Sequence, residues 1–179
     1  MNEPAPLSHR VIHTRASARQ IPDLLQAVFV AELLSPSRCL WLISPWVSDI
    51  PIIDNRTNAF LSLDPLWTRT QVTLSQVLIR ILELRTTVHV ATRPDVRNRA
   101  FLDRLRRAAE PEGLPLLMHE QEELHEKGIL GDGFYLSGSM NFTYSGIALN
   151  EEAVHFIASP ATVAENRLIL LSRWGGEAT

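Results

Sequence analysis

The residue types that could carry chemistry in this chain are concentrated in residues 124–141, LHEKGILGDGFYLSGSMN. His125 and Lys127 are two residues apart, so in a strand they project from the same face, roughly 7 Å from each other. Ser139 and Asn141 repeat this spacing further along. The pattern predicts one face that carries an imidazole, an ammonium, a hydroxyl and an amide.

These four groups suit a phosphodiester substrate. An imidazole can attack phosphorus, and an ammonium can neutralise a non-bridging oxygen. A hydroxyl and an amide can donate hydrogen bonds to the other oxygens. Asp132-Gly133 is a hairpin-turn signal between the two pairs of residues, and Gly138 allows close backbone approach. The stretch therefore predicts a β-hairpin with a phosphate-binding face.

Six chemically defined positions of this stretch resemble the HKD signature of the phospholipase D superfamily: His125, Lys127, Asp132, Gly138, Ser139 and Asn141. The family usually has six residues between the aspartate and the glycine, whereas this chain has five, residues 133–137. A one-residue deletion inside a strand would move side chains to the other face, so we expect the turn at Asp132-Gly133 to absorb it.

The resemblance implies a two-step reaction that needs neither metal nor cofactor. His125 would attack phosphorus and form a phosphohistidine, which water then hydrolyses. Lys127, Ser139 and Asn141 would bind the phosphate oxygens, and Asp132 belongs to the same catalytic set. An inactive family member is the alternative for the motif as a whole.

Two further groups are implied by the resemblance. The family has a carboxylate that orients its histidine, and Glu151 corresponds to that position, so Glu152 is expected to face the other way. The leaving oxygen needs a proton, which in the family comes from a second HKD histidine. Because this chain has one copy of the motif, the resemblance implies a homodimer in which the symmetry-related His125 is the acid.

Length and composition limit the class of protein. The 179 residues fit an arm at 1–16 and a single phospholipase D-like domain at 17–179. The formal charge is −3, so a polyanion would have to bind a local patch. Cys39 is the only cysteine, which excludes an internal disulfide. With no signal pattern and no apolar run long enough for a membrane span, we expect a cytoplasmic protein.

Hydrophobic periodicity predicts an α/β fold, a mixed sheet flanked by helices on both faces. Besides the hairpin, strands are expected at 38–45, 86–92, 113–118 and 150–158. Helices are expected at 18–34, 71–84, 94–109, 142–149 and 161–174. The phospholipase D-like fold is similar to this arrangement.

Two regions are candidates for substrate binding. Residues 46–69 form a long aromatic and apolar connection after a buried strand, where sites tend to lie in α/β sheets. Trp46 and Arg56 could form a substrate wall there, although a dimer contact or plain packing explains this loop equally well. Arg93 and Arg97 begin the only dense basic region, which is either a phosphate-binding face or a solvated helix face.

The sequence favours a phosphodiesterase that acts on nucleic acid, DNA rather than RNA. Residues 43–56 also resemble the phospholipase D-like protein encoded with bacterial DNA-modification and phage-defence clusters, which implies work within a larger complex. Two alternatives stay open. One is a phospholipase or phosphatidyltransferase, which would need an exposed apolar surface. The other is a non-catalytic dimeric subunit that binds nucleic acid.

Overall fold

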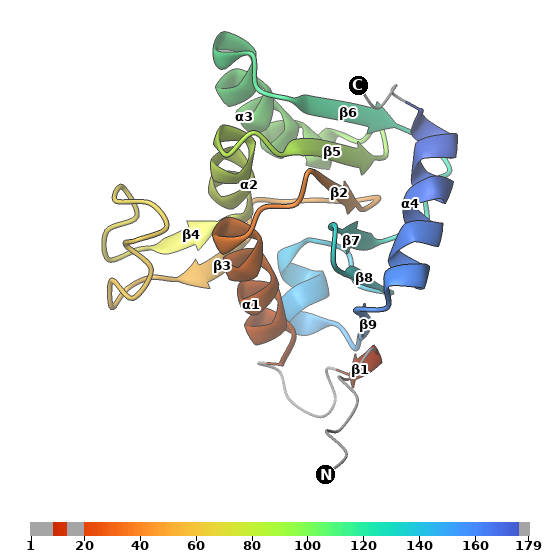
Figure 1. Cartoon of the computed structure of the whole chain (residues 1–179), viewed down its shortest axis with the longest axis horizontal. Helices are drawn as coiled ribbons and strands as arrows, with labels where there is room; N and C mark the ends of the chain where they lie inside the picture. Colours follow the sequence, from red (N-terminus) through yellow and green to blue (C-terminus); the bar gives the residue numbers. More distant parts are fainter. Residues whose placement is uncertain (1–8, 14–19, 176–179) are drawn as a thin grey trace.

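The computed structural model describes residues 9–13 and 20–175, and within them seven strands form one mixed sheet (Figure 1). The sheet order is β1-β9-β8-β7-β2-β5-β6, and β3 and β4 form a separate ribbon. The strands are β1 (His9–His13), β2 (Cys39–Ile43), β3 (Pro51–Asp54), β4 (Gln71–Thr73), β5 (Thr87–Thr92), β6 (Leu116–Glu120), β7 (Gly128–Leu130), β8 (Tyr135–Gly138) and β9 (Ala153–Ile157). The helices are α1 (Gln20–Leu34), α2 (Leu74–Glu83), α3 (Val96–Glu112), the π-helix η2 (Ser145–Leu149) and α4 (Pro160–Trp174).

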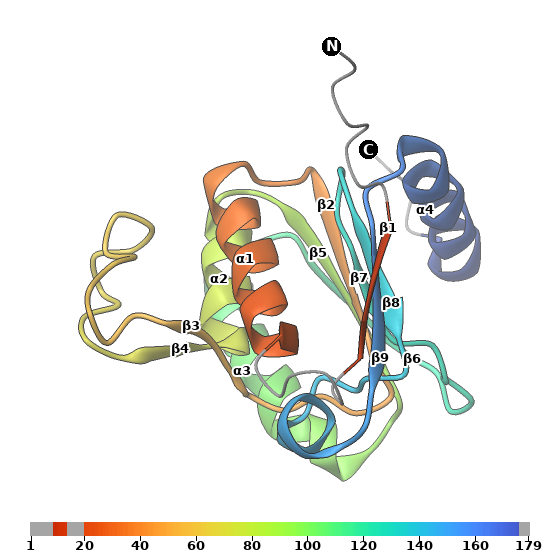
Figure 2. The ribbon, with the colours of Figure 1, turned by 90° about the horizontal axis from the view of Figure 1, so that it is seen from below.

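Helices cover both faces of the sheet, which confirms the predicted fold class (Figure 2). α1, α2 and α3 pack on one face, where the larger core contains the buried Phe29 and Phe101. α4 lies on the other face over a smaller cluster that includes Trp41 and Leu170. β2 is apolar throughout and β5 is buried from Val88 to Thr92, because both of their faces are covered.

The sheet has a parallel half and an antiparallel half. β2 runs parallel to β5, and β5 runs parallel to β6. β7, β8 and β9 form an antiparallel meander, and β7 joins it to β2 by pairing Gly128 with Ile43. The carboxyl ends of β2 and β5 therefore lie at the same edge of the sheet as the start of β7.

The connection after β2 contains more regular structure than the sequence predicts. β3 and β4 pair as an antiparallel ribbon that projects from the body of the molecule (Figures 1 and 2). Its loop is held by the buried Asn55, whose Oδ1 accepts from Phe60 N at 2.8 Å and whose amide donates to Trp67 O. The sequence pattern does not predict β3, because this strand buries two adjacent residues, Ile52 and Ile53, and so lacks the alternation of a half-buried strand.

The edge strand β1 corrects the prediction of an N-terminal arm. Residues 9–13 pair with β9 in antiparallel register, and Ile12 is buried in the larger core. A five-residue edge strand with one buried side chain gives too weak a pattern to recognise. The remaining residues of the predicted arm, 1–8 and 14–16, lie outside the described residues.

Candidate active site

The predicted phosphate-binding groups lie at the open end of the β7–β8 hairpin. Gly128 pairs with Ser137, so the residues before β7 and after β8 leave the sheet at the same end. His125 and Lys127 precede β7 rather than lying inside a strand. Their position beside the carboxyl ends of β2 and β5 agrees with the usual place of sites in α/β sheets.

Arg93, which follows β5 directly, holds the segment that carries His125. Its Nε donates to Leu124 O at 2.8 Å, and its Nη2 lies 3.2 Å from Nδ1 and 3.3 Å from Nε2 of His125. Because a guanidinium has donors only, it can bond only to an unprotonated ring nitrogen. A neutral ring has one such nitrogen, so one of the two Arg93 contacts can be a hydrogen bond. Lys127 Nζ donates to the backbone oxygen of His125.

Ser139 is held by β9 and by a carboxylate. A Cβ at Gly138 would lie 2.1 Å from Ala153 O, so only glycine lets β8 approach β9 this closely. Ser139 N donates to Ala153 O, and Ser139 Oγ accepts from Ala153 N at 3.1 Å. The hydroxyl donates to Glu152 Oε2.

The Glu152 contact corrects one sequence prediction. Glu152 was expected to face away from the site, but its carboxylate bonds to Ser139, whereas the role of Glu151 as the carboxylate that orients His125 stays a prediction. Both glutamates precede β9, so strand alternation does not determine their directions. Glu151 is exposed.

Asn141 enters the site next to the end of β2. Ser44 Oγ is buried and lies 3.5 Å from Asn141 Oδ1, 2.7 Å from Trp46 O and 3.2 Å from Phe142 N. The hydroxyl of Ser44 therefore ties the residues after β8 to the residues after β2. This brings Asn141 and Trp46 to the same edge as Arg93.

Trp46 contacts both predicted arginines and the residue that caps the start of α3. The guanidinium carbons of Arg93 and Arg97 lie 5.2 Å and 4.7 Å from its ring centroid, which is cation–π range. Its Nε1 donates to Asp95 Oδ2 at 3.1 Å, and Asp95 caps α3 by accepting from Arg97 N. Hydrogen bonds from Arg97 hold the pKa of Asp95 well below its usual value.

Sequence reasoning missed Asn98, which joins these parts. It is fully buried, its Oδ1 accepts from Val47 N at 2.8 Å, and its Nδ2 donates to Pro45 O and Arg93 O. The amide thus fixes Trp46 and Arg93 relative to each other. The one available signal was a neutral amide in the first turn of a helix otherwise rich in arginine.

Asp132 lies at the closed end of the hairpin, away from the other predicted catalytic residues. Its Oδ2 accepts from Arg38 N at 2.9 Å, and its Oδ1 pairs with Arg167 Nη1 at 2.7 Å. Burial raises its pKa, but the hydrogen bond from Arg38 N and the charge of Arg167 outweigh this and lower it. Asp132 N donates to Ser37 Oγ at 2.7 Å, so the turn is bonded on several sides.

Arg56 is also not brought together with the other candidates. It lies in the ribbon region and pairs with Asp54 at 2.6 Å, and hydrogen bonds from Arg56 lower the pKa of Asp54 to about 2. Both residues line a cavity of about 440 Å³ between α1 and the ribbon, which Tyr144 and Ile147 also line. Arg56 thus contributes to this cavity and not to the open end of the hairpin.

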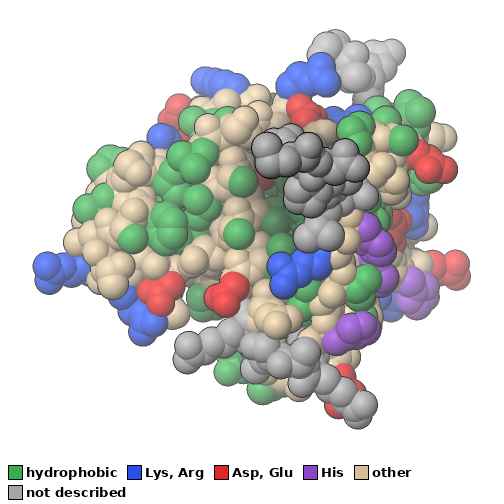
Figure 3. Space-filling view, turned by 60° about the horizontal axis from the view of Figure 1, so that its bottom comes forward, with side chains coloured by type: hydrophobic (Ala, Val, Ile, Leu, Met, Phe, Trp, Pro, Cys, Tyr) green, Lys and Arg blue, Asp and Glu red, His purple; other side chains and the backbone are tan. Residues whose placement is uncertain are grey.

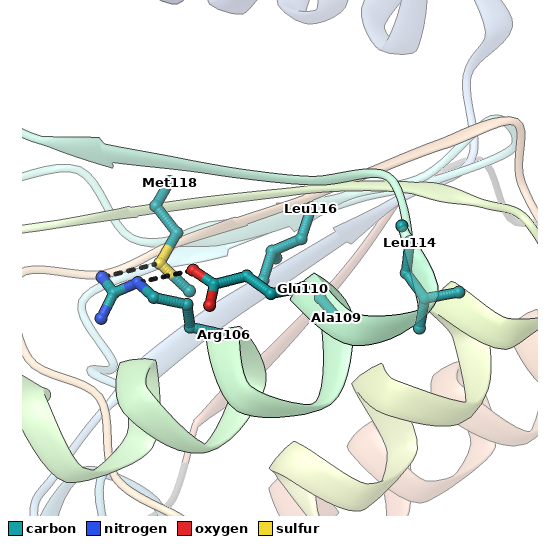
Figure 4. A pocket seen from close by; sticks show the side chains of 7 residues that line it. Arg106, Ala109, Glu110, Leu114, Leu116 and Met118 are labelled. Carbon is teal, nitrogen blue, oxygen red and sulfur yellow. Dashed lines mark hydrogen bonds and ion pairs between the residues drawn. The ribbon is translucent and has the colours of Figure 1, made fainter.

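The arginines of α3 are largely neutralised by acidic residues. Arg104 pairs with Asp49 at 3.0 Å, and Arg106 pairs with Asp103 at 2.8 Å. A cavity of about 280 Å³ lies between α3 and β6, where Arg106 also bonds to Met118 Sδ (Figure 4). On the face in Figure 3, basic and acidic side chains are interspersed rather than gathered into one basic patch.

Two kinds of feature are absent from the described residues, 9–13 and 20–175. They contain no group of three or more His, Cys, Asp or Glu side chains that could hold a metal ion. None of their helices has both the length and the apolar composition needed to cross a membrane.

The sequence matches a known family over more than half of its length. The family model described as cardiolipin synthase, PLD-like domain, matches residues 65–174. The chain therefore belongs to this phospholipase D-like family of phosphodiesterases, as the HKD resemblance predicted. No curated protein matches the sequence.

Several solved structures share the fold at low sequence identity. Nuc from Salmonella typhimurium, a phospholipase D family member, is 16% identical with a TM-score of 0.60, and the match covers 93% of each chain. NucT from Helicobacter pylori is 10% identical with a TM-score of 0.59, covering 90% of this chain and 91% of that one. TrmBL2, an archaeal chromatin protein described with a novel mode of DNA binding, is 13% identical with a TM-score of 0.55, covering 97% of this chain and 54% of that one.

Proposed function

We propose that this chain is a metal-independent phosphodiesterase that cleaves nucleic acid, DNA in preference to RNA, in the cytoplasm. The observation that carries the proposal is the contact of Arg93 with both ring nitrogens of His125 at the open end of the hairpin. An imidazole held by a cation, beside an ammonium and a hydroxyl, suits attack on a phosphodiester. Trp46 and Arg97 next to Arg93 supply an aromatic and a cationic contact for the rest of a nucleotide strand.

The reaction has two steps. A ring nitrogen of His125 attacks phosphorus, a P–N bond forms, and the P–O bond to the leaving alcohol breaks. Water then attacks phosphorus, the P–N bond breaks, and His125 is released as a neutral imidazole. Lys127 and Asn141 stabilise the charge on the equatorial oxygens, and the Ser139 hydroxyl joins them when its proton turns from Glu152 to the phosphate.

The leaving alkoxide must be protonated, and we assign this step to His125 of a second copy of the chain. Each active site then contains two imidazoles, one that attacks and one that acts as the acid. Water gives up its proton to the second imidazole in the next step, which restores both residues. The homodimer is therefore part of the proposed catalytic centre.

Hydrolysis in excess EDTA tests the proposal directly. Purified protein is incubated with end-labelled single- and double-stranded DNA and RNA, beside His125→Ala and the control His155→Ala, which removes an imidazole from β9. We expect cleavage by the wild type and the control and none by His125→Ala. Cleavage that EDTA abolishes, or that survives His125→Ala, would contradict the mechanism.

Mixing wild type with His125→Ala tests the shared site. If both imidazoles of a site come from two copies, a mixed dimer lacks one of them. Activity per wild-type chain should therefore fall as the variant is added in excess. Activity that is independent of the variant would show that each chain works alone.

A second candidate function is phosphatidyl transfer or phospholipid cleavage, because the matching family model is described as a cardiolipin synthase domain. Vesicles of anionic phospholipid in the same assay separate the two substrates.

We also propose that the protein works within a larger complex, because residues 43–56 resemble a protein of DNA-modification and phage-defence clusters. Size-exclusion chromatography of the protein isolated from its own host tests this part.

A further inference from the structure

The backbone that carries His125 and Lys127 has few regular hydrogen bonds of its own. Residues 121–127 follow β6 and precede β7, outside both strands. Gln121 N bonds to Thr92 O and Leu124 N to Gln121 O, which fixes the start of the segment. The direction of the later residues therefore depends on side-chain contacts.

Glu126, which stands between the two motif residues, provides such a contact. Its Oε2 pairs with Arg173 Nη1 at 2.9 Å, and its Oε1 accepts from the Tyr135 hydroxyl at 3.3 Å. Burial and the charge of Glu126 raise the pKa of Tyr135 to about 12, so this phenol stays a donor at neutral pH. The Glu126 and Arg173 side chains are 29% and 32% exposed, so water screens the pair only in part.

Arg173 reaches the segment at two places. Besides Glu126, its Nε donates to Gln121 Oε1 at 3.1 Å, so one guanidinium spans the stretch that contains His125. The guanidinium carbon lies 4.4 Å from the ring centroid of Trp174. Trp174 in turn stacks with Trp41 at 5.9 Å and with His119 at 5.8 Å, which anchors the end of α4 to the sheet.

We propose that Arg173 and Glu126 are positioning residues for His125 and Lys127. Arg173 and Tyr135 hold the side chain of Glu126, and this contact restrains the backbone between His125 and Lys127. Arg93 holds the same segment through Leu124 O and the His125 ring. The last turn of α4 thus helps to position the catalytic residues.

This inference rests on the proposed phosphodiesterase activity, and it has a matched control on the same helix. Arg167 also lies on α4 and also bonds to the hairpin, through Gly131 O and Asp132 at the closed end. Arg173→Ala should lower kcat about ten- to hundredfold with little change in KM, because misplacement of a reacting group costs turnover. Arg167→Ala should lower the unfolding midpoint and leave kcat unchanged below that temperature.

Two further variants separate positioning from a general loss of structure. Arg173→Lys, which keeps the charge, should recover part of kcat. In a double-mutant cycle, Glu126→Gln should cost little once Arg173 has become Ala, because both changes break the same contact. Additive losses in kcat, or an Arg173→Ala enzyme with normal kcat, would overturn the inference.

Amide hydrogen exchange gives a readout that needs no activity. Arg173→Ala should speed exchange in residues 122–127 and leave β5 unchanged, whereas Arg167→Ala should act on the turn between β7 and β8. If the wild type cleaves nothing but this exchange pattern appears, the proposed function fails and the positioning contact stands. If the wild type cleaves and exchange in 122–127 is unaltered, the positioning contact fails alone.

Discussion

The two ends of the β7–β8 hairpin use their charged residues differently. At the closed end, Asp132 bonds to Arg38 N and pairs with Arg167, so its charge is neutralised within the fold. At the open end, His125 is exposed and its ring contacts the cation of Arg93. A charged side chain that is already paired with an opposite charge is less available to bind a substrate. The open end, in contrast, presents donors that an anion can use.

This difference separates residues that the motif groups together. His125 and Lys127 stand only a few residues from Asp132 in the sequence, but β7 places them at opposite ends of the hairpin. The closed end fixes the strands, and the open end keeps its polar groups accessible. We therefore expect changes at the open end to affect turnover and changes at the closed end to affect stability.

Ser139→Ala should have the largest effect among variants beyond the nucleophile. Loss of one donor to the phosphate lowers kcat about a hundredfold. Hydrolysis of bis(p-nitrophenyl) phosphate measures this, and Ser137→Ala in the neighbouring strand β8 is the matched control. Equal losses in both variants would mean that the strand, and not the Ser139 hydroxyl, matters.

The stability of the sheet that carries both ends should depend on pH, because His89 lies inside this sheet beside Trp41. Burial, with a smaller contribution from His119, lowers the pKa of His89 to about 4. The unfolded chain takes up this proton near pH 6.5, so stability is complete above that value and is lost as pH falls toward 4. The loss should be about 3 kcal/mol.

Urea unfolding at pH 7.5 and pH 4.5 measures this loss. His89→Phe keeps a ring against Trp41 but removes the titration, so its free energy of unfolding should depend less on pH. An identical pH dependence in the two proteins would assign the effect to other groups.

Asp132→Ala should cost about 2 kcal/mol of unfolding free energy, because it removes charged hydrogen bonds and leaves the guanidinium of Arg167 unpaired. At a temperature where the variant is folded, kcat should equal that of the wild type. The sequence assigned Asp132 to the catalytic set. A loss of kcat without a loss of stability would support that assignment and contradict the difference between the two ends.

Trp46→Ala should have the smallest effect, and only on long substrates. The loss of one stacking platform is worth about 1 kcal/mol, or about fivefold in KM for an oligonucleotide. Hydrolysis of bis(p-nitrophenyl) phosphate should be unaffected, and Trp46→Phe should keep most of the affinity. An equal effect on both substrates would place Trp46 in the support of His125.

The fold class and the hairpin could be predicted from the sequence because their signals are local. Residues 124–141 contain both the side-chain spacing and the Asp132-Gly133 turn, and strands and helices follow from periodicity. The directions of Glu151 and Glu152 could not be predicted, because they precede β9 and do not alternate as strand residues do.

The contrast between Arg56 and Arg93 shows another limit. Both are arginines in candidate regions, but which one reaches His125 depends on whether residues 46–69 fold over the site or out into the ribbon. Contacts within the ribbon decide this, through Asn55, Trp67 and the pairing of β3 with β4. Sequence spacing contains no information about that choice.

Trapping of the covalent intermediate tests the central claim most directly. Protein mixed briefly with a short oligonucleotide is quenched in alkali, where a phosphohistidine survives, then digested and analysed by mass spectrometry. We predict a nucleotidyl adduct on His125 in the wild type and in Asp132→Ala, and none in His125→Ala. Cleavage of the oligonucleotide without an adduct on His125, or with one on another residue, would contradict the claim that the open end of the hairpin carries the nucleophile.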